Sequence, residues 1–234
     1  MPRYPGGKNL AGVYQLHINE IPPHELFVEA FFGSGAITRL KRPAAHTIGI
    51  DMAYQTRQYF PGDIAGTHIV GDGIAWLRDH QDRLGPDAFV YADPPYLHDT
   101  RVKLLLYDYE LTREQHEDLL EACNALRCNV MLCGYPSRIY GEALRPPKWR
   151  TKSYRVITRG GTLRTERIWM NYPKPAELHD YQYLGRDYHD RERIKRRQRN
   201  WVRFLSGMPD LERAAMMAHL NDSFPGFAPG EERN

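Results

Sequence analysis

Short runs of hydrophobic residues alternate along the chain with stretches in which apolar residues recur every three or four positions. The runs predict buried strands at Leu26 to Ala30, Thr47 to Ile50, His68 to Val70, Ala88 to Ala92 and Asn129 to Leu132. The stretches between them predict helices at Ala36 to Lys41, Met52 to Tyr59, Ile74 to Arg83 and Glu114 to Leu126. Strands that alternate with helices in this way are typical of a parallel α/β sheet.

The pattern changes after Gly134. Ser153 to Thr158 and Thr165 to Asn171 have the composition of two strands, and the turn-prone segment RGGTLR lies between them. An antiparallel hairpin is therefore expected to close the sheet. Together the runs predict a Rossmann-like α/β fold with a mixed, mostly parallel seven-stranded sheet and helices on both faces.

A proline-rich segment, NYPKP at residues 171–175, is expected to end the compact core. We therefore expect a first domain over residues 1–175 and a basic helical extension over residues 176–234, with one helix from about Asp190 to Leu205 and a shorter one after Pro209. Between Arg186 and Arg203 there are eight basic and three acidic residues. This excess favours a polyanionic partner, and a helix that docks on an acidic protein surface is the competing interpretation.

Composition bounds the class of protein. The chain has 234 residues, of which 41% are hydrophobic and 26% charged, as in ordinary globular proteins. No apolar run approaches the roughly 18 to 20 residues that span a bilayer, and the first residues lack the apolar core of a signal peptide, so we expect a cytoplasmic protein with no membrane partner. Cys123, Cys128 and Cys133 have no zinc-like spacing, so we expect reduced packing residues and no metal.

A glycine turn follows the first strong strand. The segment VEAFFGSG places Gly33 and Gly35 where the chain must turn tightly and let a ligand approach the backbone. Thr38 occupies the position of the third glycine of a dinucleotide fingerprint, which disfavours a nicotinamide cofactor. The next two strands end at Asp51 and at Asp72, and together with the turn they predict an adenosine-bearing ligand at this edge of the sheet. The alternative is that both aspartates only cap the helices that follow.

The fourth strand runs directly into Asp93-Pro94-Pro95-Tyr96. Prolines neither continue a helix nor donate to a sheet ladder, so the chain leaves the strand rigidly. The exocyclic amine of a nucleobase is a poor nucleophile because its lone pair is delocalised, and the Asp93 carboxylate and the Pro94 carbonyl can each accept one of its N–H groups.

The motifs RYPGGK, FFGSG, IGID, GDG and DPPY, in this order, resemble those of the D12-class, Dam-like, S-adenosylmethionine-dependent DNA adenine-N6 methyltransferases. The resemblance covers roughly residues 3–172 and is closest to small members, many of which are carried by phages or prophages, in restriction-modification or DNA-protection settings. It implies a class I methyltransferase fold, S-adenosyl-L-methionine as the cofactor and DNA as the substrate. With DNA as the substrate, the target adenine must be flipped out of the duplex, and we expect Tyr96 to stack on it. It also implies a cofactor site made by Tyr4 and Lys8 at the methionine part, Phe32 along it, Asp51 on the ribose, Asp72 on the adenine amine, and the turns at Gly33, Gly35 and Gly73.

Dam-like enzymes normally carry a target-recognition domain between the glycine turn and DPPY, and here that interval is already filled by predicted strands and helices. DNA contacts are therefore expected from other basic residues, namely Arg101, Lys103, Arg159, Arg164, Arg196, Arg197 and Arg199. Three other functions remain open: a cytosine-N4 methyltransferase, an enzyme that modifies glutamine amides or RNA, and a non-catalytic DNA-binding protein that retains the cofactor fold.

Overall fold

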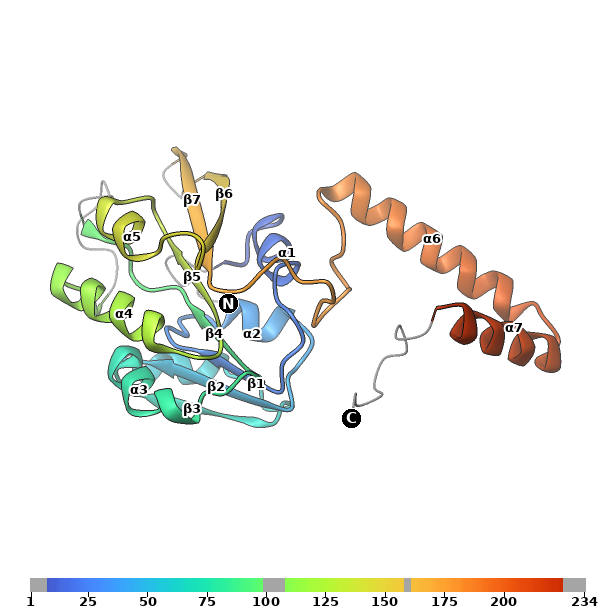
Figure 1. The fold of residues 1–234 in the computed structure, drawn as a ribbon, viewed down its shortest axis with the longest axis horizontal. Coiled ribbons are helices and arrows are strands. Elements are labelled where there is room, and N and C mark those ends of the chain that lie inside the picture. The colour runs from blue at the N-terminus through green and yellow to red at the C-terminus, as the bar shows by residue number, and fades with distance from the viewer. Residues whose placement is uncertain (1–7, 99–107, 158–160, 225–234) are drawn as a thin grey trace. The chain divides into compact units, whose positions relative to one another are not determined.

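The protein is represented by a computed structural model, which describes residues 8–98, 108–157 and 161–224. The chain forms two compact units, Met1–Tyr183 and Leu184–Asn234. The first unit is a sheet with helices on both faces (Figure 1). The predicted α/β fold with a mixed, mostly parallel seven-stranded sheet is confirmed.

The strand order places a crevice in the middle of the sheet. The strands are β1 (Leu26–Glu29), β2 (His46–Asp51), β3 (Gly66–Val70), β4 (Ala88–Ala92), β5 (Asn129–Gly134), β6 (Arg150–Ile157) and β7 (Leu163–Met170), in the order β3-β2-β1-β4-β5-β7-β6. β1 to β5 are parallel, whereas β7 runs antiparallel to both of its neighbours. The chain moves outward from β1 to β3 and then returns to β4 on the other side of β1. This reversal makes a switch point between β1 and β4, where open α/β sheets bind their ligands.

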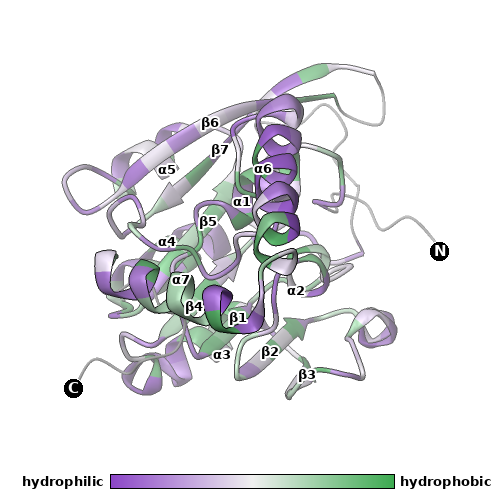
Figure 2. Cartoon of the chain, turned by 90° about the vertical axis from the view of Figure 1, so that its right-hand side faces the viewer, coloured by the Kyte–Doolittle hydropathy of each residue, from purple (hydrophilic) through white to green (hydrophobic). Residues whose placement is uncertain are grey.

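Side chains that alternate along each strand build two apolar layers. Val28 and Val90 face the layer covered by α3 (Gly73–Asp79), α4 (Arg113–Ala125) and α5 (Arg138–Ala143). Phe27 and Phe89 face the opposite layer, which α1 (Val13–Ile18) and α2 (Ala36–Leu40) cover (Figure 1). The central strands β4 and β5 are largely green in Figure 2, as expected for strands buried on both faces, whereas the edge strand β6 is mostly hydrophilic and exposed.

Some predicted elements differ from the observed ones. The predicted helix at Met52 to Tyr59 is a 3₁₀ helix, η1 (Tyr54–Tyr59), and the predicted helix at Ile74 to Arg83 splits into α3 and a 3₁₀ turn, η2 (Gln81–Arg83). The six-residue helices α1 and α5 were not predicted, because elements of this length show too few turns of periodicity. The capping box at Thr112 and Gln115 is confirmed at the start of α4.

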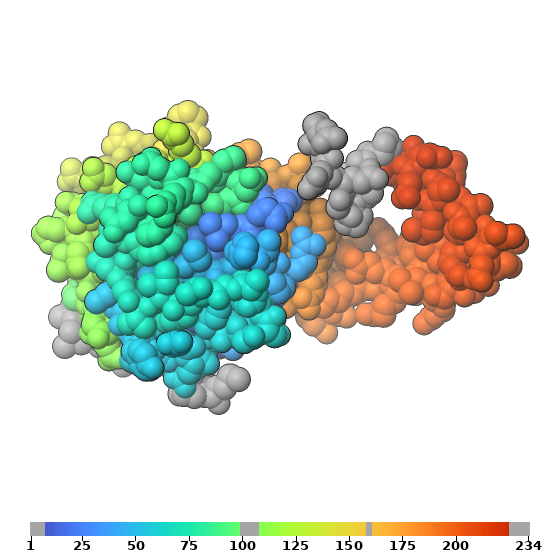
Figure 3. Space-filling view, turned by 90° about the horizontal axis from the view of Figure 1, so that it is seen from below, coloured from blue at the N-terminus to red at the C-terminus, as the bar shows by residue number. Residues whose placement is uncertain are grey.

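Segments from the first hundred residues pack side by side in the first unit, and Figure 3 shows their blue, cyan and green residues intermixed on one surface. Residues 176–183 also belong to this unit. His179 and Asp180 are buried, and the carboxylate of Asp180 accepts the backbone N–H of Arg42 at 2.9 Å.

The second unit consists of α6 (Tyr188–Ser206) and α7 (Asp210–Ser223), neither of which has a buried residue. The larger part of α6 is hydrophilic in Figure 2. Within the described residues, no helix is both long and apolar enough to cross a bilayer.

Candidate active site

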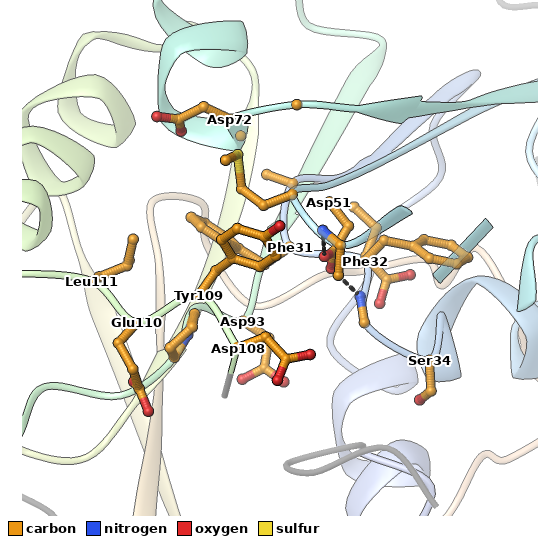
Figure 4. Close-up of a pocket in the computed structure, with 18 of the residues that line it drawn as sticks. Phe31, Phe32, Ser34, Asp51, Asp72, Asp93, Asp108, Tyr109, Glu110 and Leu111 are labelled. Carbon is orange, nitrogen blue, oxygen red and sulfur yellow. Dashed lines mark hydrogen bonds between the residues drawn. The ribbon is translucent and has the colours of Figure 1, made fainter. Parts of the chain in front are cut away.

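A cavity lies at the carboxyl ends of four neighbouring parallel strands, at the switch point between β1 and β4. Its lining comes from residues 30–34 after β1, Asp51 at the end of β2, residues 71–73 after β3, and Asp93 and Pro95 after β4. Lys8 and the segment 108–111 complete the wall. Figure 4 shows the carboxylates of Asp51, Asp93 and Asp108 arranged around this space. The motifs that were singled out in the sequence therefore converge on one site.

Asp51 ties the end of β2 to the glycine turn. One of its carboxylate oxygens accepts the backbone N–H of Gly33 at 2.6 Å, and the other accepts that of Ala53 at 2.8 Å (Figure 4). Burial raises the pKa of the Asp51 carboxyl, and these two backbone donors oppose the shift. The carboxylate thus fixes the backbone where a ligand must approach, while its remaining lone pairs stay available to a hydroxyl group.

Two glycines are required by close contacts in this region. Gly35 has a φ of +57°, and a Cβ placed on it would lie 2.2 Å from the ring of Phe32. A Cβ on Gly73 would lie 2.0 Å from the carbonyl oxygen of Ala30. Gly35 therefore allows the turn after β1 to close over the Phe32 ring, and Gly73 allows the segment after β3 to approach the end of β1 beside the cavity.

The two phenylalanines of the FFGSG motif have different environments. Phe32 is 2% exposed, and its ring packs on Phe60 at 5.6 Å and edge-on to His68 at 5.1 Å. Phe31 is half-buried and also lines the cavity, although the sequence analysis did not select it. The contact of Phe32 with a cofactor stays a prediction.

Asp72 caps α3, since its carboxylate accepts the backbone N–H of Ile74 at 2.8 Å. This is the alternative considered from the sequence, and it does not exclude ligand binding because the residue also lines the cavity. A capping carboxylate keeps a second oxygen for other donors.

Asp93 forms an ion pair with Lys8. Both carboxylate oxygens lie 2.6 Å from Nζ of Lys8, and the same Nζ lies 2.7 Å from the hydroxyl oxygen of Tyr96. Burial raises the pKa of the Asp93 carboxyl, and Lys8 opposes that shift. Burial by itself lowers the pKa of the Lys8 amine, but Asp93 and Glu166 outweigh it and hold that pKa above its ordinary value. The expected contact of Lys8 with the cofactor stays a prediction, since its described partners are Asp93, Tyr96 and Glu166.

Tyr96 is buried at 8% exposure rather than displayed on the surface. Its ring packs edge-on to Tyr135 with centroids 4.7 Å apart, and its hydroxyl donates to the carboxylate of Glu166 at 3.0 Å. Glu166 also accepts the hydroxyl proton of Tyr154 at 2.7 Å. Pro94 is buried and does not line the cavity. Stacking of Tyr96 on a base stays a prediction.

Several site residues were missed by the sequence analysis. Glu29 lines the cavity at 3% exposure, and burial raises the pKa of its carboxyl to about 7. Asp108, which also lines it, accepts an amide N–H from Gln55 at 3.2 Å. A charged residue inside a buried strand, as in VEAFFGSG, is a usable sequence signal for Glu29. No local signal places Glu166 beside Tyr96, because 70 residues separate them.

The predicted DNA contacts are spread over different parts of the chain. Arg164 lies near the start of β7, opposite Val156, and is half-buried. Arg196, Arg197 and Arg199 are exposed on α6 of the second unit. Tyr4, Arg101, Lys103 and Arg159 lie outside the described residues.

No protein-family model and no curated protein matches this chain. Among solved structures it resembles an S-adenosylmethionine-dependent methyltransferase from Agrobacterium tumefaciens, with 11% identity, 67% of this chain and 58% of that chain covered, and a TM-score of 0.44. It also resembles precorrin 8w decarboxylase from Methanobacterium thermoautotrophicum, with 12% identity, 74% and 95% coverage, and a TM-score of 0.49.

A third similar structure is an rRNA methylase from Streptococcus thermophilus, with 10% identity, 71% and 97% coverage, and a TM-score of 0.46. This chain spans less than two thirds of the Agrobacterium protein. Similarities at these levels carry no information on the reaction that this chain performs.

Proposed function

We propose that this protein is an S-adenosyl-L-methionine-dependent DNA methyltransferase that modifies the N6 amine of adenine. One observation carries the proposal: Asp93, the first residue of the DPPY motif, lines the same cavity as Gly33, Asp51 and Asp72. A donor site at the first three strand ends and an amine site at the fourth would thus share one rim, as methyl transfer between two substrates requires.

The chemistry of the lining fits this cofactor. Asp93 is paired with Lys8, and the remaining acidic side chains of the lining are Asp51, Asp72, Asp108, Glu110 and Glu29, the last with a pKa that burial raises to about 7. A predominantly acidic wall favours a ligand that carries a sulfonium and an ammonium group. Asp51 has lone pairs for the ribose hydroxyls, Asp72 has a second oxygen for the adenine amine, and Phe31 offers an apolar wall. When bound, the cofactor supplies an electrophilic methyl group.

The residues of this chain would prepare the amine. Lys8 holds the Asp93 carboxylate through both oxygens, and each oxygen keeps a further lone pair. Asp93, which lines the cavity, would then accept one N–H group of the amine. The carbonyl of Pro94, which does not line the cavity in this structure, stays the second acceptor predicted from the sequence, and together the two would draw the nitrogen out of conjugation with the ring. Because the prolines hold both acceptors rigidly, little reorganisation is needed during the reaction.

The test is incubation with labelled S-adenosylmethionine and unmethylated duplex DNA, followed by nucleoside digestion and mass spectrometry. N6-methyladenine is the expected product. Detection of N4-methylcytosine instead would show that the substrate base is cytosine, since the same acceptors suit any exocyclic amine. Cofactor binding without a methylated deoxynucleoside would overturn the proposal and direct the search to RNA and protein substrates.

A further inference from the structure

Lys8, Asp93 and Tyr96 form a hydrogen-bonded group, the Asp93 cluster. A second buried acidic side chain, Glu166 of the antiparallel strand β7, lies next to this cluster. Glu166 is 8% exposed and Lys8 is 6% exposed. The carboxylate oxygen Oε2 of Glu166 lies 3.8 Å from Nζ of Lys8 and 3.0 Å from the hydroxyl oxygen of Tyr96. Lys8 therefore lies between two carboxylates, with Asp93 at 2.6 Å as the nearer one.

Glu166 accepts hydrogen bonds from two tyrosines and lies within ion-pair distance of Lys8. A lysine ammonium only donates, so the Tyr96 oxygen accepts from Lys8 and Tyr96 has its own proton to give to a carboxylate. The Tyr154 hydroxyl donates to the same oxygen of Glu166 at 2.7 Å and lies 2.8 Å from Nε2 of His17. Oε2 of Glu166 is therefore an acceptor in both contacts, and it is also the oxygen nearest to Lys8.

Lys8 lies within ion-pair distance of both Asp93 and Glu166, so two acidic side chains share one ammonium group. The other titratable groups packed around Glu166 are Tyr96, Tyr154, Cys133 and, through Tyr154, His17. Burial raises the pKa of the two tyrosines and of the thiol and lowers the pKa of the histidine, so all four are neutral.

Building on the proposed function, we propose that Asp93 accepts the proton that the substrate amine loses and that Glu166 is a positioning residue for this step. Glu166 shares Lys8 with Asp93 and thereby makes Asp93 a stronger base. When the amine nitrogen gains the methyl group it carries one proton too many. The N–H bond breaks, its electron pair stays on nitrogen, and the proton bonds to a carboxylate oxygen of Asp93. Lys8 then still has an ionised partner in Glu166, so no buried ammonium is left unpaired.

The direct test is a ¹³C NMR titration of protein labelled at the aspartate side-chain carboxyl, with the Asp93 signal assigned by its loss in Asp93→Asn. Glu166→Gln keeps the shape and removes the charge, so the pKa of Asp93 is expected to fall by about one unit. Glu20→Gln is the matched control. Glu20 is also buried and also holds two donors, Arg150 and Lys152, but none of its described partners is in the Asp93 cluster.

Two further variants separate charge from geometry. Glu166→Asp keeps the charge and should leave the pKa of Asp93 closer to that of the wild type than Glu166→Gln does. Tyr154→Phe removes one donor from Glu166 and should raise the pKa of Asp93, so the inference remains testable if Glu166→Gln does not fold. An Asp93 pKa that is unchanged or raised in folded Glu166→Gln overturns the role of Glu166, whatever substrate the enzyme has.

The kinetic counterpart is the pH dependence of single-turnover methylation. In Glu166→Gln the acidic limb should move about one pH unit lower, and the plateau should fall by up to about tenfold, because a weaker base accepts the proton less readily. Loss of folding alone would lower the rate without moving the limb. A wild-type protein that methylates no DNA counts against the proposed function, and the NMR comparison still decides the role of Glu166.

Discussion

Nζ of Lys8 lies 2.6 Å from each carboxylate oxygen of Asp93, although 85 residues separate the two in the chain. Both side chains are largely buried, at 7% and 15% exposure, so the pair is shielded from the solvent that weakens surface ion pairs. The lysine orients the carboxylate at the end of β4 and leaves lone pairs for a second donor. This contact joins the first motif of the sequence to the DPPY motif.

Replacing Asp93 with alanine is expected to abolish methyl transfer. The single-turnover rate should fall at least about a hundredfold to a thousandfold, which is the usual cost of losing one preorganised contact to the reacting group. Cofactor affinity should stay nearly intact, because Asp93 serves the base. Single-turnover rates and equilibrium dialysis with labelled S-adenosylmethionine measure the two effects separately. Asp93→Asn, which keeps the side-chain volume, controls for packing. Parallel loss of rate and cofactor affinity would refute this division of roles.

The turn after β1 depends on Gly35. Gly35→Ala places a Cβ against the Phe32 ring at a φ of +57°, so the free energy of unfolding should fall by at least about 2 kcal/mol and cofactor affinity should drop. Gly141→Ala is the matched control, since it lies in α5 with no atom within 4 Å of the added Cβ. That change should stabilise the protein by roughly 0.5 to 1 kcal/mol. Urea unfolding would distinguish them, and equal effects at the two sites would contradict the assignment.

The arginines of α6 are predicted to bind the DNA backbone. Changing Arg196, Arg197 and Arg199 to glutamine should weaken DNA binding and reduce the slope of log affinity against log salt by up to about three, at about 0.9 per lost phosphate contact. Three exposed arginines on other helices, Arg78, Arg113 and Arg138, each pair with an acidic neighbour and provide the control triple variant. Equal salt slopes for wild type and the α6 variant would show that this helix serves another partner.

His24 should make the stability of the first unit sensitive to acid. It is buried, its ring stacks on that of His179 at 3.8 Å, and burial lowers the pKa of His24 to about 2. In the unfolded chain His24 has its ordinary pKa of about 6.5, so below that pH the unfolded chain takes up a proton that the folded chain does not. The free energy of unfolding is therefore highest above pH 6.5 and decreases as the pH falls. The contribution lost between pH 6.5 and 5.0 is roughly 1.5 kcal/mol.

The measurement is urea unfolding of wild type and His24→Gln at the two pH values, with the exposed His46→Gln as the control. Glu29 acts in the opposite direction: burial raises its pKa to about 7, so its contribution to the free energy of unfolding decreases as the pH rises from about 4.5 to 7. Because Glu29 is present in both proteins, its contribution cancels when the free energy of unfolding of the variant is subtracted from that of the wild type. A pH dependence that is the same in wild type and His24→Gln would exclude the histidine as its source.

The sequence indicated the fold through local patterns. Apolar runs such as Ala88 to Ala92 were confirmed as strands, because a strand buried on both faces needs continuous hydrophobicity. The helix predicted at Met52 to Tyr59 is a 3₁₀ helix at Tyr54–Tyr59. Over six residues the 3.0-residue period of a 3₁₀ helix and the 3.6-residue period of an α-helix are hard to separate. The sequence predicted that Gly33, Asp51, Asp72 and Asp93 lie at one edge of the sheet, because each follows a parallel strand, and all four line the cavity; their roles toward a ligand stay predictions.

By itself the sequence determined the strands, the glycine turn and the rigid DPPY segment, because backbone propensity and burial periodicity act within a few residues. Only the tertiary structure decided which polar groups face one another. The pairing of β7 between β5 and β6 brings Glu166 beside Tyr96 and Lys8, and the return of the chain from β3 to β4 brings Asp93 beside the glycine turn. Such contacts depend on strand order and on the antiparallel direction of β7, which are set by packing between distant segments rather than by any local pattern.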